Sequence, residues 1–395
     1  MIETRMPTAD PDRPRAADVF AVAHDTVYLD CAAMGPRLHA VVAAGHAALD
    51  ASITPWLPTF EAWEAQIEAL RSCVAETLFD GDSDGIALVP SAAYGLATAA
   101  RNVALAAGDV VLALDGQFPS NLLPWQQRCT DTGARMLAVQ RGDSQDWATA
   151  ICAALQTTPR VRVVALPNAH WNDGAWVDLD RVAPQVHAAG AALVLDLSQS
   201  LGALPVALAR WRPDFIVAVG HKWLLGPPGL AWLWASARWR SEGIAIAPHW
   251  SARDAGHDWT FPVEAAPAYR RGARRFDAGG VSDGLRLAMA QAAIEQIRAW
   301  QVPWLMQQLQ QRTDAFDAAL DAHGLQAWKT PGHAAHFTAL QPPPGLLDAV
   351  ADALRDHRIV CTRRRGILRI APHLHVDVDT MREVVAVAAA VVCAR

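Results

Sequence analysis

Short apolar runs alternate with stretches of helical periodicity between residues 86 and 234, and this alternation limits the possible folds most strongly. The seven runs are 86–90, 110–114, 135–139, 161–166, 192–196, 215–219 and 230–234. The helical stretches between them include 94–106, 145–156 and 178–189. Continuous apolar strands separated by helices indicate a mainly parallel sheet covered on both faces. The sequence therefore predicts an α/β fold with a seven-stranded, mainly parallel sheet, whose ligands bind beyond the carboxyl ends of the strands.

The flanking segments predict a second, smaller unit. We expect an N-terminal arm over residues 1–25 that joins the small domain, a large domain over 26–284 and a small α+β domain over 285–395. The outer helices are expected at 37–52, 60–79, 285–300, 303–322 and from about 378, and the outer strands at 334–341, 357–362 and 366–370. An irregular segment as long as 248–284 is usually functional.

Charge and cysteine content exclude several classes of function. The 395 residues carry a net charge of −6, so no basic field for nucleic acid is present. The six cysteines show neither a Cys-x-x-Cys pair nor a metal-ligand spacing, which indicates reduced thiols, a cytoplasmic protein and no metal site. No run approaches the ~20 apolar residues that cross a bilayer. We expect a small-molecule substrate.

Lys222 is the first candidate catalytic residue. Only two of the 34 basic residues are lysines, Lys222 and Lys329. Lys222 follows the apolar run 215–219 and precedes Trp-Leu-Leu, and burial there lowers the pKa of an amine. A deprotonated amine can attack a carbonyl, which a guanidinium cannot do. The alternative is a leftover surface charge, but the apolar setting favours catalysis.

Two further strand ends carry chemistry. Ser91 to Gly95 opens a helix with small residues, which suits an anion such as phosphate, although Ser91 alone can be a simple cap. Asp196 ends a buried strand one strand before Lys222, and a buried acid needs a cationic or proton-bearing partner. Its alternative role is a cap with Ser198 and Ser200. The glycine fingerprints of dinucleotide and triphosphate sites are absent.

These groups together suit pyridoxal 5'-phosphate. This cofactor has an aldehyde for Lys222, a ring nitrogen for Asp196, a phosphate for the helix start and a flat face for Phe118. Asp196 would keep the ring nitrogen protonated, and Lys222 would also carry the Cα proton.

At this point the chain resembles the class V aminotransferase family of fold-type-I pyridoxal-phosphate enzymes, which includes cysteine desulfurases, selenocysteine lyases and kynureninases. The resemblance covers nearly the whole chain. It is carried by Tyr28–Pro36, Phe118–Trp125, Asp196–Gln199, Gly220–Gly229, Arg275–Gly279 and Leu368–His373.

The resemblance implies roles for the cofactor site. Lys222 is expected to form the Schiff base, Asp196 to pair with the pyridine nitrogen, Gln199 to bond the ring hydroxyl and Phe118 to lie against the ring. The residues expected near the phosphate are Ser91, Ala92, Ala93, Ser198 and His221. Asn172 falls where relatives place a polar contact.

The resemblance also implies a substrate site and a partner. Arg369 matches the arginine that binds the substrate α-carboxylate, and Trp250 falls in a loop over the site. The family is typically a homodimer whose partner loop, here residues 275–282, completes each site.

One departure indicates the reaction. Cysteine desulfurases carry a histidine stacked on the cofactor, whereas this chain has Phe118, as in the kynureninase branch. We therefore expect an enzyme acting on an α-amino acid by elimination or cleavage at Cβ, as in C–S lyases and kynureninases. Transamination or epimerisation is the alternative, and a pyridoxal-phosphate-binding protein without turnover is a third possibility.

Overall fold

The computed structural model describes residues 16–23, 25–142, 146–254, 261–281 and 283–393. Residues 1–15 and 24, which belong to the predicted N-terminal arm, lie outside the described residues. The same holds for Ser282, the last residue of the predicted partner loop.

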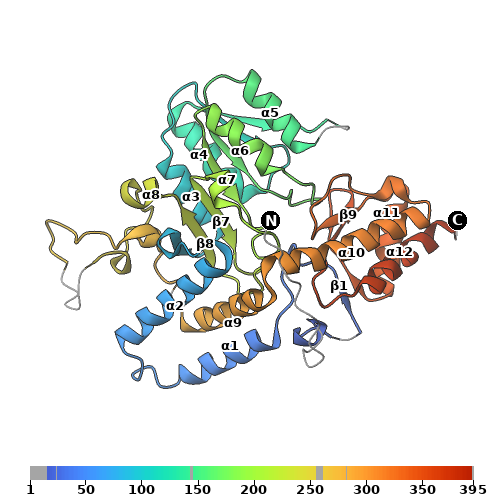
Figure 1. Cartoon of the computed structure of the whole chain (residues 1–395), viewed down its shortest axis with the longest axis horizontal. Helices are drawn as coiled ribbons and strands as arrows, with labels where there is room; N and C mark the ends of the chain where they lie inside the picture. Colours follow the sequence, from blue (N-terminus) through green and yellow to red (C-terminus); the bar gives the residue numbers. More distant parts are fainter. Residues whose placement is uncertain (1–15, 24, 143–145, 255–260, 282, 394–395) are drawn as a thin grey trace, which may run out of the picture.

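A seven-stranded sheet forms the centre of the large domain (Figure 1). Its strands are β2 (Ile86–Val89), β3 (Val110–Leu114), β4 (Arg135–Val139), β5 (Val161–Leu166), β6 (Ala192–Asp196), β7 (Phe215–Val219) and β8 (Ala231–Ala235). The order is β2-β8-β7-β6-β5-β3-β4, and all neighbours from β7 to β4 are parallel. Strand β8 is antiparallel to both β7 and β2. The predicted mainly parallel sheet of seven strands is confirmed.

Both faces of this sheet are covered because alternate strand residues point to opposite sides. One face, which includes Ala87 and Val217, packs against α3 (Ala92–Asn102), α4 (Leu123–Thr132) and α8 (Ala237–Glu242). The other face, which includes Leu88 and Leu195, packs against α2 (Phe60–Leu78), α5 (Trp147–Thr157), α6 (Leu179–Ala188) and α9 (Gly284–Trp300). The short α7 (Leu208–Trp211) precedes β7, and α1 (His39–Ala51) packs along α9.

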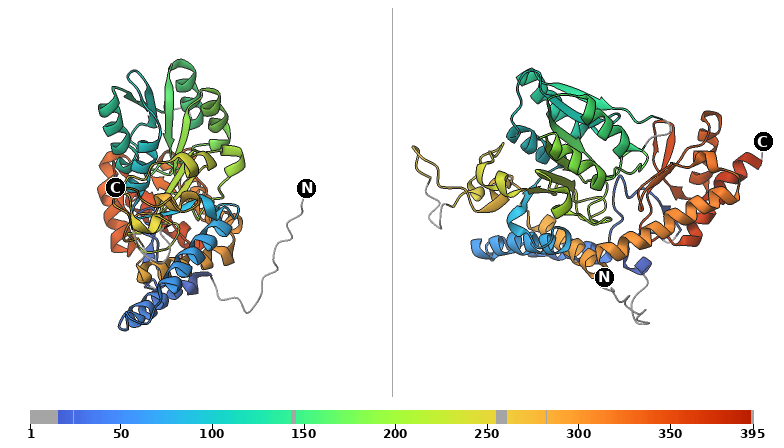
Figure 2. Two further views of the ribbon diagram at one scale, coloured as in Figure 1. Left: turned by 90° about the vertical axis from the view of Figure 1, so that its left-hand side faces the viewer. Right: turned by 45° about the horizontal axis from the view of Figure 1, so that its top comes forward.

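The small domain combines the C-terminal segment with a strand from the N-terminal region. Its antiparallel sheet has the order β11 (Arg363–Arg364), β12 (Ile367–Ile370), β9 (Thr338–Leu340). Strand β1 (Val27–Tyr28) pairs in parallel with β10 (Ile359–Val360). The helices are α10 (Val302–Ala322), α11 (Pro344–Asp356) and α12 (Val378–Cys393). In Figures 1 and 2, α9 and α10 run one after the other from beneath the large sheet into the small domain.

Helix α11 and strand β11 are additions to the predicted elements, whereas the domain boundaries near residues 25 and 284 remain predictions. Among the described residues, no helix has both the length and the apolar character needed to cross a membrane.

Candidate active site

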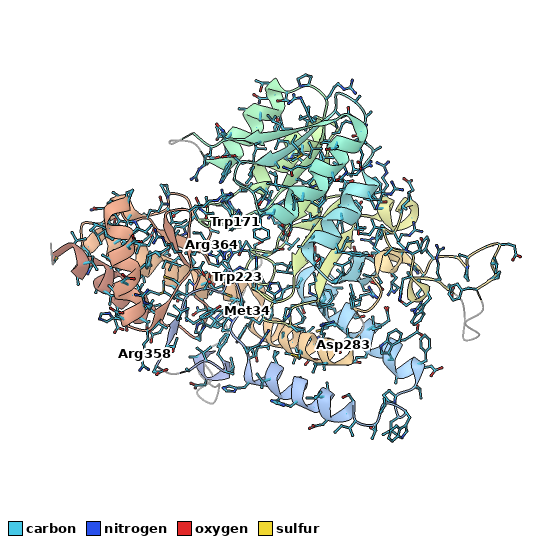
Figure 3. All side chains as sticks on the ribbon, turned by 180° about the vertical axis from the view of Figure 1, so that it is seen from behind. Met34, Trp171, Trp223, Asp283, Arg358 and Arg364 are labelled. Carbon is cyan, nitrogen blue, oxygen red and sulfur yellow. The ribbon has the colours of Figure 1, made fainter. Side chains whose placement is uncertain are left out.

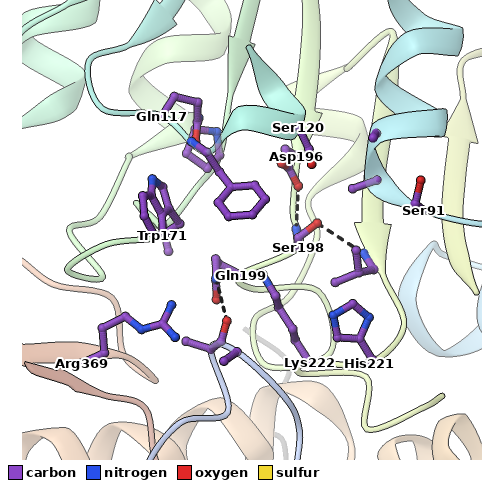
Figure 4. Close-up of a pocket in the computed structure, with 18 of the residues that line it drawn as sticks. Ser91, Gln117, Ser120, Trp171, Asp196, Ser198, Gln199, His221, Lys222 and Arg369 are labelled. Atoms are coloured by element: carbon purple, nitrogen blue, oxygen red, sulfur yellow. Dashed lines mark hydrogen bonds between the residues drawn. The ribbon is translucent and has the colours of Figure 1, made fainter. Parts of the chain in front are cut away.

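A pocket of about 370 Å³ lies between the carboxyl ends of the central strands and the small domain (Figure 4). The predicted site residues that line it are Lys222, Asp196, Gln199, Phe118, Ser91, Ala92, Ala93, Ser198, His221 and Arg369. They come from the start of α3 and the residue before it, from the end of β6, from the turns after β3, β6 and β7, and from β12. Residues far apart in sequence therefore meet at one edge of the sheet.

The Lys222 backbone is held by a tight turn and by a neighbouring segment. The Gly220 N–H donates to the Leu230 carbonyl at 3.0 Å, and the Gly35 N–H donates to the His221 carbonyl at 2.7 Å. A Cβ on Gly35 would lie 2.1 Å from the Lys222 carbonyl oxygen, so only glycine fits there. The Lys222 side chain points into the pocket (Figure 4).

Burial controls the charge of Lys222. It lowers the pKa of the amine to about 8, although nearby Asp196 acts in the opposite direction. The amine Nζ lies 5.5 Å from the centre of the Phe118 ring. Near pH 8, a large share of Lys222 is therefore the free amine, which is the nucleophilic form.

Asp196 is a buried acid at the end of β6. It is 6% exposed, and one carboxylate oxygen accepts a hydrogen bond from the Ser198 N–H at 3.1 Å. Within the part of the chain that the structure describes, Asp196 forms no ion pair, and burial raises its pKa. The helix cap weighed from the sequence is not formed, because no helix begins directly after Asp196. The bond from the Ser198 N–H closes a local turn instead, and Asp196 lines the pocket. A proton-bearing group in the pocket would offset its cost of burial.

Gln199 is fixed at both ends of its side-chain amide. Its Nε2 donates to the Ala32 carbonyl at 3.0 Å, and its Oε1 accepts from Trp223 Nε1 at 3.2 Å. Its own carbonyl lies 2.5 Å from His336 Nε2. Since an amide nitrogen carries two hydrogens, one N–H of Gln199 remains for a ligand oxygen.

The start of α3 and the turn before Lys222 supply neutral donors. Ser91 caps α3, because its Oγ accepts the Tyr94 N–H at 3.1 Å, and it also lines the pocket with Ala92 and Ala93. Burial, aided by the charge of Lys222, lowers the pKa of His221 to about 4. His221 is therefore neutral at pH 7 and can donate one ring N–H to an anion.

Arg369 is held by an acid that the sequence analysis missed. The Arg369 guanidinium, 3% exposed, donates to the Asp30 carboxylate at 2.7 Å, and Thr362 Oγ1 donates to the other oxygen of Asp30. The sequence does contain a signal that could have identified Asp30. An aspartate in an apolar segment next to β1 indicates a buried acid, and a buried acid requires a partner. Gln117, Trp171 and Arg364 also line the pocket without having been predicted.

Two predicted site residues are not among the residues that line this pocket. Asn172 directly follows the lining residue Trp171, and its buried side-chain oxygen has no partner among the described residues. Trp250 stacks on Trp63, with ring centres 5.9 Å apart, and lies 6.2 Å from Phe60. Their proposed contacts stay predictions.

Comparison with protein families and curated proteins adds an independent finding. The family model described as "Aminotransferase class-V" matches residues 27–315. An uncharacterized aminotransferase, YcbU, of Bacillus subtilis is 24% identical over 82% of this chain and 84% of its own length. A cysteine desulfurase of Klebsiella pneumoniae is 27% identical over 65% of this chain and 63% of its own length. A kynureninase of Deinococcus radiodurans is 27% identical over 61% of this chain and 54% of its own length.

Solved structures share the fold. The apo cysteine desulfurase of Thermococcus onnurineus superposes with a TM-score of 0.81 at 17% identity, over 97% of this chain and 99% of that chain. The cystine C–S lyase C-DES in complex with cysteine persulfide gives a TM-score of 0.81 at 19% identity, over 93% and 98%.

Proposed function

The chain belongs to the class V aminotransferase family, and from this premise we propose that it is a pyridoxal-5'-phosphate enzyme that eliminates or cleaves a group at Cβ of an α-amino acid. The observation that carries the proposal is the meeting of Lys222, Asp196 and Arg369 in one pocket.

The residues of the pocket fit this cofactor. Asp196 is a buried acid that forms no ion pair with any described residue, which suits a protonated ring nitrogen, and one N–H of Gln199 is left for a ring oxygen. The start of α3 and neutral His221 suit a phosphate. When bound, the cofactor supplies an aldehyde that condenses with amines and a ring that withdraws electrons from Cα.

The side chains then have separate tasks. Lys222 holds the cofactor through Nζ and, once released, accepts the Cα proton at the same atom. Arg369 binds the α-carboxylate with its guanidinium, which Asp30 holds in position. Phe118 lines the pocket beside Nζ and offers a flat face to the cofactor ring.

The position of the cysteines supports elimination or cleavage more than transfer of sulfur to the enzyme. All six cysteines belong to the described residues, and none of them lines the pocket. Cys31 is buried behind Lys222, with its thiol 3.9 Å from the Lys222 carbonyl oxygen, and Cys361 faces a different cavity. A group that leaves Cβ therefore has no thiol acceptor in this pocket.

Transamination is the second candidate, because the relative YcbU is named an aminotransferase and aligns over 82% of this chain. The products distinguish the candidates. Elimination or cleavage at Cβ releases pyruvate or alanine, transamination releases a 2-oxo acid matching the donor, and epimerisation releases only the mirror-image amino acid. A protein that binds the cofactor without turnover releases none of these.

The absorbance spectrum of the purified protein tests the proposal. We expect a visible band in the wild type that is absent in Lys222→Ala. The matched control is Lys329→Ala, which changes the only other lysine of the sequence and should retain the band. Pyruvate or alanine should then appear with at least one amino acid of a panel. A colourless wild type that stays colourless with added pyridoxal 5'-phosphate would overturn the proposal.

We also propose that the protein is a cytoplasmic homodimer in which the loop 275–282 contributes to the partner's site. Sedimentation should give about twice the chain mass of 42.5 kDa. A fully active monomer would contradict this proposal.

A further inference from the structure

Three consecutive arginines lie in the hairpin between β11 and β12, where Arg363 and Arg364 form β11 and Arg365 begins the turn. Arg363 lies on the outer side and forms an ion pair with Asp348 of α11. Arg364 lines the pocket that also contains Lys222. Arg365 and Gly366 turn the chain with positive φ angles of 43° and 84°. Within the described ranges, neither Arg364 nor Arg365 forms an ion pair.

The hairpin tip rests on a platform of the large domain. Trp171 Nε1 donates to the Gly116 carbonyl at 2.7 Å, and the Arg365 guanidinium lies 5.6 Å from the centre of the Trp171 ring. Arg365 Nη1 lies 2.7 Å from the position of a Cβ on Gly116, and the φ of 65° at Gly116 favours glycine there. These contacts fix the tip, and Figure 3 shows Arg364 near Trp171 where the two domains meet.

The platform connects directly to the reacting end of the pocket. Trp171 meets Phe118 edge to face, with ring centres 5.3 Å apart, and Phe118 lies 5.5 Å from Lys222 Nζ. A substrate whose α-carboxylate lies on Arg369 and whose amine lies near Lys222 would therefore have its side chain along this aromatic wall. Arg364 lines the same pocket.

Arg364 pairs with Ile367 in this hairpin and therefore lies on the same face as Arg369, but the two arginines differ in their partners. The charge of Arg369 is largely balanced by Asp30 at 2.7 Å, whereas Arg364 has no acidic partner among the described residues. An unbalanced guanidinium at a pocket attracts an anion, and its planar fork suits an oxyanion with two oxygens.

We propose that Arg364 binds a second anionic group at the end of the substrate side chain. The preferred substrates are then α-amino acids whose side chain ends in an oxyanion, a carboxylate or a sulfinate. Arg365 acts as a positioning residue through Trp171. This inference rests on the proposed function, because it takes Arg369 as the site of the α-carboxylate.

Pairs of amino acids that differ only in the distal charge test the proposal. Aspartate is compared with asparagine, glutamate with glutamine, and cysteine sulfinate provides the sulfur oxyanion. Affinity is measured from the spectral change of the cofactor-loaded protein, and also by calorimetry with glutarate and butyrate, which carry no amine. The variants are Arg364→Gln and Arg364→Glu. The matched control is Arg363→Gln, which removes the same charge one residue away.

We expect the wild type to bind at least one acid of the panel about 10- to 100-fold more tightly than its neutral partner, as for a hydrogen bond to a charged group. Arg364→Gln should abolish this ratio, Arg364→Glu should reverse it, and Arg363→Gln should preserve it. Equal weakening of acids and amides in Arg364→Gln would overturn the proposal, because Arg364 would then act on the α-carboxylate. A wild type that does not distinguish the pairs would also overturn it.

Failure of the proposed function has a different signature. It removes the visible band and the spectral titrations, but it leaves the calorimetric comparison of glutarate with butyrate unaffected. That comparison should still respond to Arg364→Gln and remain unchanged in Arg363→Gln.

Discussion

Lys222 and Asp196 carry opposite charges in the same pocket, yet burial affects each more strongly than the other's charge does. Burial lowers the pKa of the Lys222 amine and raises the pKa of the Asp196 carboxyl. Both shifts favour the neutral forms, since desolvation penalises a charge. In this state the lysine is a nucleophile and the carboxyl group can share a proton with a ring nitrogen.

The lowered pKa of Lys222 predicts how the protein captures its cofactor. The free-amine fraction should rise as the pH rises through about 8, rather than near the ordinary value of 10.5. We expect the rate at which the cofactor-free protein develops its visible band to increase up to about pH 9, roughly one unit above this pKa, and then level off. Stopped-flow absorbance from pH 6 to 10 measures this. A rate that keeps rising to pH 10 would show an ordinary lysine.

The ion pair of Arg369 with Asp30 links the predicted substrate site to the N-terminal segment. Both side chains are buried, at 3% and 9% exposure, so each needs the other's charge. The sequence indicated Arg369 through a motif but not Asp30, because the pairing depends on a contact between residues 339 positions apart.

Asp30→Asn should therefore destabilise the protein strongly. Removing one member of a buried pair typically costs about 3–5 kcal/mol, and the released guanidinium should also raise the KM for every amino acid. The matched control is Asp25→Asn, which breaks the exposed pair with Arg358 and should cost at most about 1 kcal/mol. Urea unfolding of both variants gives the comparison. Equal losses would mean that burial does not set the strength of the Asp30 pair.

At the scale of elements, α3 reaches the pocket because it packs closely on β7. A Cβ on Gly95 would lie 2.7 Å from Val217 Cγ1, so the glycine permits this approach. The first residues of the helix then line the same pocket as Lys222, and the first turn of a helix has N–H groups without partners inside the helix.

Substitutions of Gly95 and Val217 should have coupled effects on the free energy of unfolding. Gly95→Ala should push α3 away from the sheet, with a typical overpacking cost of about 1–3 kcal/mol, and should weaken phosphate binding. Val217→Ala creates the missing space, so the double variant should be more stable than the sum of the single changes by about 1 kcal/mol or more. Urea unfolding of the four proteins measures the coupling.

Gly345→Ala in α11 is the control for this cycle, since a Cβ there meets nothing within 4 Å and should cost no stability. Additive effects of Gly95→Ala and Val217→Ala would contradict close packing as the reason for the glycine.

The elements that sequence predicts well are those whose signal is local. All seven strands of the large sheet follow continuous apolar runs, and Lys222 was found because it directly follows one of them. Arg364, in contrast, lies in a short hairpin whose pocket contact depends on how the domains meet. No local pattern distinguishes it from Arg363, which points to Asp348.

At the scale of the whole molecule, the buried His336 and His373 and the partly buried His375 lie near the junction of the two domains. His336 Nε2 lies 2.5 Å from the Gln199 carbonyl oxygen, and His375 Nε2 lies 2.9 Å from the Tyr28 carbonyl oxygen. His373 is surrounded by aromatic rings, with Phe20 at 5.2 Å and Trp300 at 5.7 Å. Neither ring nitrogen of His373 has a partner among the described residues.

These three histidines predict that the folded protein loses stability on the acid side. Burial lowers the pKa of His336 and His375 from 6.5 to about 4, and it lowers the pKa of His373 well below 6.5. Between pH 6.5 and 4 the unfolded chain therefore binds more protons, so stability is full above pH 6.5 and falls below it. Each histidine contributes about 1.4 kcal/mol per pH unit in this range. Urea unfolding at pH 7, 6 and 5 measures the slope.

A substitution of His373 isolates its part of this slope. His373→Phe keeps an aromatic ring among Phe20 and Trp300 but removes the proton uptake, so the decline between pH 6 and 5 should become shallower by about 1.4 kcal/mol. The slope is the readout, because a larger ring can change the absolute stability by overpacking. His46→Gln, a substitution of an exposed histidine on α1, should leave the slope unchanged. If His373→Phe keeps the wild-type change of stability with pH, then His373 does not take up the proton on unfolding. The acid sensitivity must then arise from other groups.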